Sequence, residues 1–295
     1  MNRYKAREIF GNYAFVLPAV VLFAVFSAYP FLKVFHLSAF EFDGISPDKL
    51  FVGFGNITDI LFNNPVFWGS MKNALIITVL ALVVQNSLAL SLALACDRDI
   101  RFGNVYRVIF YIPPVLSGIV VGLIWQWIYD GNYGLFNHLL EFLRLGHLKR
   151  AWLADGNTAL YAVAVIHMWK GFGWGFIVLL AGLQSIPREL YEAAKVDGAN
   201  AWHTFMNVTA PLMIPVFILV SVLTVLGTMQ IYDIIVSTTG GGPGYHTEVP
   251  ISRMISEMTG AGRFGYACAM GVVFGVVLLI VSVIQIRVSK SMKQA

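Results

Sequence analysis

Residues 192–199 read Glu-Ala-Ala-Lys-Val-Asp-Gly-Ala, and a proline follows at position 211. This charged, helix-forming stretch lies in a chain of 295 residues, of which 58% are hydrophobic and only 12% are charged. A soluble globular domain carries about 25% charged residues. An apolar run long enough to cross a bilayer flanks the stretch on each side, so the chain is predicted to be an integral membrane protein.

Six apolar runs reach or approach the ~20 residues that cross ~30 Å of hydrocarbon. Because backbone N–H and C=O groups find no partners in lipid, runs of this length must form helices. We therefore predict an all-α membrane protein with six transmembrane helices in a single domain over residues 1–295. The predicted spans are 13–32, 74–95, 108–128, 160–183, 212–235 and 266–288.

Basic residues gather in alternate connecting segments. More than half of the Lys and Arg lie in the amino terminus, the turns after the second and fourth spans, and the tail, whereas the other loops hold more acid than base. The positive-inside rule then places both termini and residues 192–199 in the cytoplasm, with the first span uncleaved. The net charge of +4 comes from these turns, and the absence of a basic cluster with interleaved aromatics argues against nucleic acid.

Local propensities predict a cytoplasmic surface helix over about residues 187–198. Ser185 is expected to cap it, and Pro187 suits its first turn. Ala193 and Ala194 have high helix propensity. They also present almost no side chain, so the surface of another protein can approach the backbone closely.

The helix is expected to end at Gly198, which can adopt the left-handed conformation of a helix C-terminus. A second helix should start near Ala201, and Pro211 should break it before the next span. The pattern predicts helix, glycine turn and helix on the cytoplasmic surface. By itself it also fits an ordinary amphipathic connector between two spans.

The pattern resembles the EAA signature of permease subunits of binding-protein-dependent ABC importers. In that signature Glu-Ala-Ala is followed by three residues, Gly, nine residues and Ile-x-Leu-Pro, and Val208 and Ala210 stand here where Ile and Leu are usual. Trp169-Lys170 and residues 183–187 are similar to the carbohydrate branch of these importers, and residues 238–243 to its maltose and glycerol-phosphate type. The positions in register are Glu192, Ala193, Ala194, Gly198 and Pro211.

The resemblance implies the type I importer permease fold and a coupling helix that sits in a cleft of a cytoplasmic ATPase. The implied partners are a second permease, two ATPase subunits that carry ATP and Mg, an extracytoplasmic solute-binding protein, membrane lipid and a sugar. The chain itself would hold no cofactor and would not be an enzyme, and it would lie in the cytoplasmic membrane of a bacterium or archaeon. The implied coupling residues are Glu192, Ala193, Ala194, Asp197, Gly198 and Pro211.

A sugar path needs aromatic faces together with amide or carboxyl groups. Lys170 is the strongest candidate, because a cation near mid-bilayer usually faces a polar cavity or a partner; a structural ion pair or a snorkelling side chain is the alternative. Gln85 and Asn86 are interpreted as interhelical hydrogen-bond partners. The interfacial aromatic belt is the favoured interpretation of Trp125, Trp127 and Tyr232. The candidate path residues are Trp169, Lys170, Trp174, Gln126, Gln230, Tyr232 and Asp233.

The glycine-rich stretch Gly240, Gly241, Gly242 and Pro243 fits a flexible outer turn. The resemblance instead implies a loop that contacts the external binding protein.

Other chemistries find little support in the sequence. It has no phosphate-binding Gly-x-x-x-x-Gly-Lys-Ser/Thr motif and no metal-ligand spacing of Cys or His. An intramembrane enzyme would need ionisable residues clustered at one depth, whereas only Lys170 lies deep. Within the transporter reading, a polyol, a glycerol phosphodiester or another small solute stays open as cargo.

Overall fold

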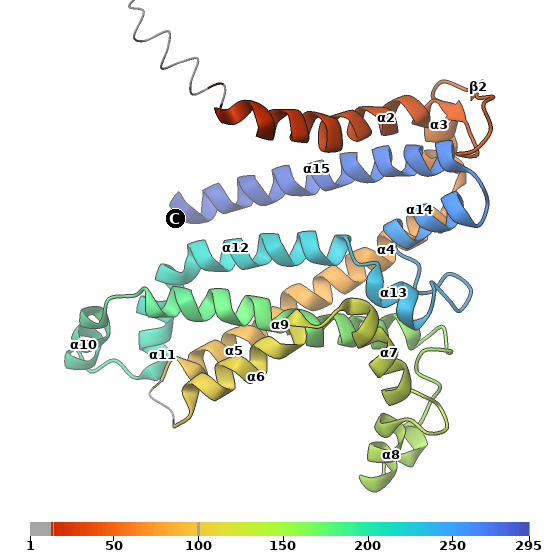
Figure 1. Cartoon of the computed structure of the whole chain (residues 1–295). Helices are drawn as coiled ribbons and strands as arrows, with labels where there is room; N and C mark the ends of the chain where they lie inside the picture. Colours follow the sequence, from red (N-terminus) through yellow and green to blue (C-terminus); the bar gives the residue numbers. More distant parts are fainter. Residues whose placement is uncertain (1–12, 14, 99–100, 295) are drawn as a thin grey trace, which may run out of the picture. The chain divides into compact units, whose positions relative to one another are not determined.

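A computed structural model describes residues 13, 15–98 and 101–294, and its long elements are all helices (Figure 1). In that part of the chain five helices are long and apolar enough to cross a membrane, or six if one sharply bent pair counts as a single span. The predicted all-α class is therefore confirmed. The long helices are Phe15–Ser38, Pro65–Cys96, Ala159–Gln184, Ala201–Met229 and Phe264–Ser289, and the bent pair is Gly103–Val115 with Gly118–Ile128.

The chain divides into two compact units. The first comprises Met1–Asn64 with Met254–Val277, and the second comprises Pro65–Arg253 with Leu278–Ala295. The single domain over 1–295 stays a prediction. Elements of the first unit are η1 (Ala24–Ala28), α2 (Tyr29–Ser38), β1 (Phe40–Glu41), β2 (Leu50–Phe51), α3 (Gly55–Asn63), most of α14 (Pro250–Thr259) and the first part of α15 (Phe264–Gln294).

A short antiparallel hairpin of β1 and β2 closes the first unit at the end of α2. The buried side chain of Asn56 donates hydrogen bonds from Nδ2 to the carbonyl oxygens of Ser38 at 2.9 Å and Phe40 at 3.0 Å. Tyr266 Oη donates to Asp59 Oδ2 at 2.7 Å. These bonds hold the hairpin and the start of α15 against α3. A buried polar group needs hydrogen-bond partners, and here the partners come from different segments of the first unit.

The second unit contains the remaining helices. Its sequence runs through α4 (Pro65–Leu80), η2 (Ala81–Gln85), α5 (Asn86–Cys96), α6 (Gly103–Val115), α7 (Gly118–Ile128), α8 (Leu135–Phe142), η3 (Gly146–Leu148), α9 (Ala159–Gln184), α10 (Arg188–Val196), α11 (Ala201–Thr204), η4 (Phe205–Thr209), α12 (Ala210–Met229) and α13 (Asp233–Thr238). Both η2 and η4 are single turns of π-helix inside longer helices.

The core of the second unit joins α5, α9 and α12. Glycines of α9 let α6 and α12 approach it closely, because lipid gives helices little apolar driving force and close packing must replace it. A Cβ on Gly173 would lie 2.3 Å from the carbonyl oxygen of Phe110, and one on Gly182 would lie 2.8 Å from Val216. The buried core residues are Ala89, Ala93, Cys96, Phe176, Leu179, Leu180, Leu183, Ile186, Met213 and Val220.

The predicted span 108–128 is not one straight helix. The chain bends by 97° between α6 and α7. Pro113 and Pro114 occupy the last turn of α6 and contribute no N–H donors, and Leu116 then takes an extended conformation with ψ of 142°. Because two successive prolines leave carbonyls of the preceding turn without partners, the helix ends there. Figure 1 shows α7 leaving the bundle sideways.

The predicted span 212–235 differs at both ends. Its helix starts at Ala201 and continues to Met229, where a short turn separates it from α13. Pro211 does not break this helix, contrary to the prediction. The π-helical turn η4 directly precedes α12, and such a turn rearranges the backbone hydrogen bonds beside the missing proline N–H.

Candidate transport cavity and coupling helix

A cavity of about 460 Å³ lies within the second unit, between α9, α12, α13 and the end of η2. Four of the seven predicted path residues come together in its wall. They are Lys170 and Trp174 on α9, Gln230 after α12 and Asp233 on α13. The cavity joins one cation, one carboxylate, an amide and an aromatic face, which is a set that can bind a polar organic solute.

Lys170 is half-buried in the cavity wall. Among the residues that the structure describes, its ammonium group makes no ion pair, in contrast to the structural ion pair considered as an alternative. His167, one helical turn earlier on α9, lines the same cavity. Asp233 accepts a hydrogen bond from the backbone N–H of Ile234 through Oδ1 at 2.9 Å, which fixes the carboxylate in the wall.

Two neighbouring amides on the second span have different surroundings. Asn86 Oδ1 accepts a hydrogen bond from Thr224 Oγ1 at 3.0 Å, so the interpretation of Asn86 as an interhelical partner is confirmed. Gln85 lines the cavity and is only 6% exposed. Its Oε1 has no hydrogen-bond partner in the described part of the chain, and it lies 2.7 Å from where a Cβ on Gly171 would be. Gln85 is therefore a polar group of the cavity that the sequence did not assign to it.

The other predicted path residues lie elsewhere. Trp169 packs edge-on against Trp125, with ring centroids 5.7 Å apart. Gln126 donates from Nε2 to the carbonyl oxygen of Thr238 at 2.8 Å. Tyr232 is half-buried and precedes α13. These three residues are absent from the wall of the 460 Å³ cavity.

The glycine-rich loop is held by its own hydrogen bonds. Gly240 and Gly241 have φ of 59° and 94°, conformations that favour glycine. Thr247 Oγ1 donates to the carbonyl oxygen of Gly242 at 2.7 Å. A Cβ on Gly241 would lie 2.0 Å from Glu248 Oε2, so a larger residue would displace that carboxylate. The loop is a defined turn, whereas the sequence also allowed a flexible one.

The predicted surface helix is present as α10 and ends as expected. Gly198 has φ of 77°. Its N–H donates to the carbonyl of Lys195 at 3.2 Å, and the N–H of Ala199 donates to the carbonyl of Ala194 at 2.9 Å. This pair of bonds is the Schellman motif, in which a left-handed glycine closes the helix.

The start of α10 differs from the prediction. Ser185 does not cap it, because α9 runs on to Gln184 and the Ser185 hydroxyl donates to the carbonyl of Gly182 at 2.7 Å. Pro187 takes the cap position, without a side-chain bond. A cap that the sequence reading missed lies after the turn, where Asn200 Oδ1 accepts from the backbone N–H of His203 at 2.9 Å. Asn is a strong N-cap residue, so the signal was present in the sequence.

Two side chains, one just before α10 and one on it, anchor this segment to the bundle. Ile186 is 8% exposed within the core cluster, and Tyr191 packs against that cluster. The Tyr191 hydroxyl is 3.2 Å from Thr209 Oγ1, the last residue of η4. At the same end of the unit, burial raises the pKa of Asp97 above its ordinary value. The positive charges of Arg107 and Arg188 lower that pKa, but by less than burial raises it.

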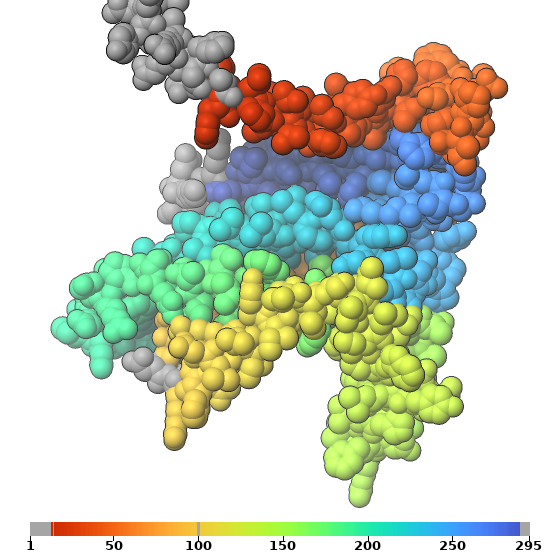
Figure 2. Space-filling view, in the orientation of Figure 1, coloured from red at the N-terminus to blue at the C-terminus, as the bar shows by residue number. Residues whose placement is uncertain are grey.

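The other face of α10 is exposed. Glu192, Ala193 and Lys195 are exposed, and Ala194 is half-buried. The following turn, with Asp197 and Gly198, is exposed as well, and so is Pro211. Figure 2 shows this segment projecting from its own unit as a lobe in the green and teal part of the colour range. The predicted coupling residues from Glu192 to Gly198 thus form an accessible surface on α10 and its turn, whereas Pro211 lies apart from them on α12.

Comparison with protein families identifies the class of the chain. A family model described as "Binding-protein-dependent transport system inner membrane component" matches residues 85–294. This match covers the cavity, α10 and the glycine-rich loop. The chain belongs to this family of multi-pass membrane components.

Two relatives and one solved structure extend the comparison over the whole chain. The chain is 32% identical to the probable ABC transporter permease protein YurN of Bacillus subtilis, across 96% of this chain and 97% of the relative. It is 31% identical to the trehalose/maltose transport system permease protein MalF of Thermococcus litoralis, across 98% and 97%. A chain of a bacterial ABC transporter involved in the import of the acidic polysaccharide alginate has the same fold, with a TM-score of 0.84, 22% identity and 98% coverage of both chains.

Proposed function

We propose that this chain is one of two permease subunits of an ATP-driven carbohydrate importer. It forms half of the translocation path, and α10 couples that path to a separate ATPase. The family assignment supports a transport role. The partners in this proposal are a second permease, two ATPase subunits that bind ATP and Mg, and an extracytoplasmic binding protein.

The observation that carries the proposal is the connection of α10 to the cavity. α10 follows α9 directly, and the helix Ala201–Met229 starts just after its glycine turn. α9 contributes Lys170 and Trp174 to the cavity, and α12 contributes Thr224. Ile186 and Tyr191 fix α10 to the core that α9 and α12 share. A partner that moves the exposed face of α10 therefore moves the two cavity walls that α9 and α12 form.

The proposed orientation follows from charge. With basic segments in the cytoplasm, both termini and α10 lie inside, and the glycine-rich loop lies outside, where it contacts the binding protein. A second solved structure with this fold is titled as the alginate transporter in complex with alginate pentasaccharide-bound periplasmic protein, again at 22% identity. That title supports a binding protein on the outer side as a partner of this chain.

Carbohydrate is the favoured cargo class. Relatives named for trehalose/maltose and for arabinooligosaccharides are 31% and 32% identical to this chain. The 58% exposed ring of Trp174 offers a face for sugar C–H groups, and Gln230 and Asp233 offer partners for hydroxyls. A phosphorylated polyol is the second candidate, because Lys170 makes no ion pair among the described residues and a relative named for sn-glycerol-3-phosphate is 30% identical.

The coupling role is tested by charge reversal at Glu192 in the complete transporter, reconstituted in liposomes with its binding protein. Glu192→Lys should abolish ATP-driven uptake while the thermal unfolding of the complex stays unchanged. Glu189→Lys, on the same exposed helix, is the matched control and should retain uptake. ATP-driven uptake and ATPase stimulation equal to wild type in Glu192→Lys would show that α10 does not couple the two subunits.

The cargo is tested at Lys170. If the cargo is an uncharged saccharide such as maltose or trehalose, Lys170→Met should change uptake less than tenfold. If the cargo is glycerol phosphate, the same variant should lose uptake by far more, because the phosphate would then enter the cavity without a counter-charge. Uptake of each compound by wild type is measured first. It decides whether Lys170→Met is tested with the saccharide or with glycerol phosphate.

A further inference from the structure

A second cavity, of about 660 Å³, opens at the end of the second unit opposite α10. Its wall combines the end of α7, the segment before α9 and the glycine-rich loop. Its lining includes Trp127, Tyr129, Asp130, Ala154, Thr238 and Pro243. The sequence assigned Gln126 to a sugar path and Pro243 to a protein contact, yet both line this one cavity.

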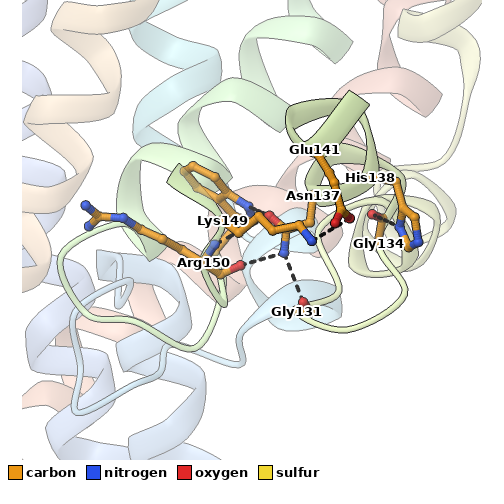
Figure 3. Close-up of polar contacts among 8 residues, drawn as sticks. Gly131, Gly134, Asn137, His138, Glu141, Lys149 and Arg150 are labelled. Atoms are coloured by element: carbon orange, nitrogen blue, oxygen red, sulfur yellow. Dashed lines mark hydrogen bonds and ion pairs between the residues drawn. The ribbon is translucent and has the colours of Figure 1, made fainter. Parts of the chain in front are cut away.

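The walls of this cavity are held together by a buried amide. Asn137 on α8 is 2% exposed, and its Nδ2 donates to the carbonyl oxygens of Gly131 at 3.0 Å and Arg150 at 2.9 Å. Its Oδ1 accepts from Trp152 Nε1 at 2.8 Å. Figure 3 shows the Asn137 side chain reaching toward Gly131 and Arg150. The two chain segments that form one side of the cavity are therefore fixed relative to each other.

Tyr129 presents a hydroxyl group from a rigid ring. Its side chain is 6% exposed, and its ring lies 5.1 Å from that of Trp125 and 5.6 Å from that of Phe136. Within the described chain this hydroxyl takes part in no hydrogen bond, and Tyr129 lines the cavity. Burial raises the pKa of Tyr129 to about 12, so the group stays protonated and able to donate.

Two further groups complete the set. Trp127 is 78% exposed and offers an aromatic face at the cavity wall. Asp130 accepts hydrogen bonds from the backbone N–H groups of Asn132 and Tyr133 through Oδ1, each at 2.8 Å. Those bonds hold the pKa of Asp130 below its ordinary value, so it is a carboxylate whose other oxygen can accept from a ligand.

The two cavities meet opposite ends of one short helix. Asp233, at the start of α13, lines the first cavity, and Thr238, at its end, lines the second. The rise between these residues is roughly 7 Å along the helix, which is about the length of one hexose unit. An aromatic face, a phenol and a carboxylate are the groups that bind a saccharide, because they match its C–H faces and its hydroxyls.

We propose that the second cavity is a saccharide-binding subsite that receives the carbohydrate on its way to the first cavity. This inference rests on the proposed function, since it takes the cargo to be a carbohydrate. Trp127 stacks on a sugar ring, Tyr129 donates to a hydroxyl and Asp130 accepts from one. A chain of three or more sugars spans both cavities, so the subsite favours trisaccharides and longer chains over disaccharides and monosaccharides.

The test uses the complete transporter in liposomes, with trehalose, maltotriose, arabinotriose and diacetylchitobiose as probes. Tyr129→Phe removes only the hydroxyl, and Trp127→Ala removes the exposed ring. For each trisaccharide that wild type transports, each variant should raise the KM of uptake about fivefold or more, with Vmax unchanged. The same variants should change the uptake of the disaccharides trehalose and diacetylchitobiose less. Tyr133→Ala, 79% exposed on the adjacent turn, is the control and should behave as wild type.

A second measurement reports on occupancy directly. Ala154→Cys places a thiol in the wall of the cavity, and 10 mM maltotriose (about tenfold or more above the usual range of KM) should slow its reaction with a methanethiosulfonate reagent. Uptake and labelling that are the same in all variants and with all probes would overturn the subsite. A second result would overturn it as well: if Trp127→Ala loses the ATPase stimulation that the binding protein causes in the absence of sugar, the cavity contacts the binding protein and not a saccharide. If wild type transports none of the four probes, the proposed cargo fails instead.

Discussion

The carboxylate of Asp233 lies directly against the backbone of Gly118. A Cβ built on Gly118 would be 1.5 Å from Asp233 Oδ2 and 2.2 Å from its Cγ. One turn further along α7, a Cβ on Gly122 would be 1.9 Å from Ser237 Oγ. Two glycines one turn apart thus let α13 lie on α7, and this contact sets where Asp233 enters the first cavity.

Substitution of Gly118 should displace Asp233 and destabilise the pair of helices. Gly118→Ala forces the Asp233 side chain out of its rotamer, and overpacking of this kind costs about 1–3 kcal/mol. We expect a lower unfolding temperature and reduced uptake. Gly275→Ala is the control, because its Cβ would meet no atom within 4 Å and alanine favours helix by about 1 kcal/mol. Equal melting temperatures for the two variants would contradict the packing described here.

Gln85 and Asn86 should respond in opposite ways to the loss of their amides. Gln85→Met removes a buried acceptor that has no partner among the described residues, so the unfolding temperature should stay the same or rise. Its uptake should fall, because the cavity loses a polar group. Asn86→Leu should lower the unfolding temperature, since Thr224 loses its partner on the second span. A melting temperature lowered by Gln85→Met, with normal uptake, would make Gln85 a structural residue instead.

The turn after α10 should require glycine at position 198 because of its left-handed backbone conformation, not because a larger side chain would clash with neighbouring atoms. A Cβ at this position would meet no atom within 4 Å, but φ is 77°. Asn tolerates this conformation and Val does not. Gly198→Asn should therefore keep ATP-driven uptake near that of wild type, whereas Gly198→Val should uncouple it. Similar uptake rates in the two variants would show that the backbone conformation of this turn is unimportant for transport.

The loop after α2 should loosen in acid. Hydrogen bonds from the Ser46 hydroxyl, and then from the N–H groups of Ile45 and Ser46, lower the pKa of Asp43 from 3.8 to about 2. A lowered folded-state pKa means that the carboxylate stabilises the turn above pH 3.8 and that this contribution is lost as the pH falls towards 2.

Hydrogen–deuterium exchange of the peptide over residues 40–50 measures this change. After correction for the intrinsic rates, protection should decrease below pH 4, and Ser46→Ala should move that decrease to higher pH. Protection that is constant from pH 2 to 6 would contradict the assigned role of Asp43.

The sequence predicted those features that depend on local chemistry. Apolar runs indicated the helices, and the left-handed requirement at Gly198 indicated the end of α10. Lys170 was expected in a polar cavity because an isolated cation is costly in lipid, and it lies in one. Such arguments need only the residue and its immediate neighbours along the chain.

Features that depend on distant contacts were not predictable. Nothing in the spacing of Gln126 showed that its amide would bond to the carbonyl of Thr238, far along the chain. Gln85 and Asn86 are adjacent amides of similar chemistry, and only the positions of Thr224 and Gly171 separate their roles. The role of the buried Asn137 could not be predicted, because its partners Gly131 and Arg150 carry no signal beyond their backbone carbonyls.

The π-helical turn Ala81–Gln85 has a consequence for how this span tolerates change in length. Such a turn holds one residue more than the α-helix around it. Deleting one residue within it would let the backbone close into regular α-helix with little strain. The side chains before and after the deletion would keep nearly the same relative directions, because the wider π-turn already takes up the extra residue. A one-residue deletion from the regular α-helix between Gln85 and the end of the span would instead rotate the two parts by about 100° relative to each other.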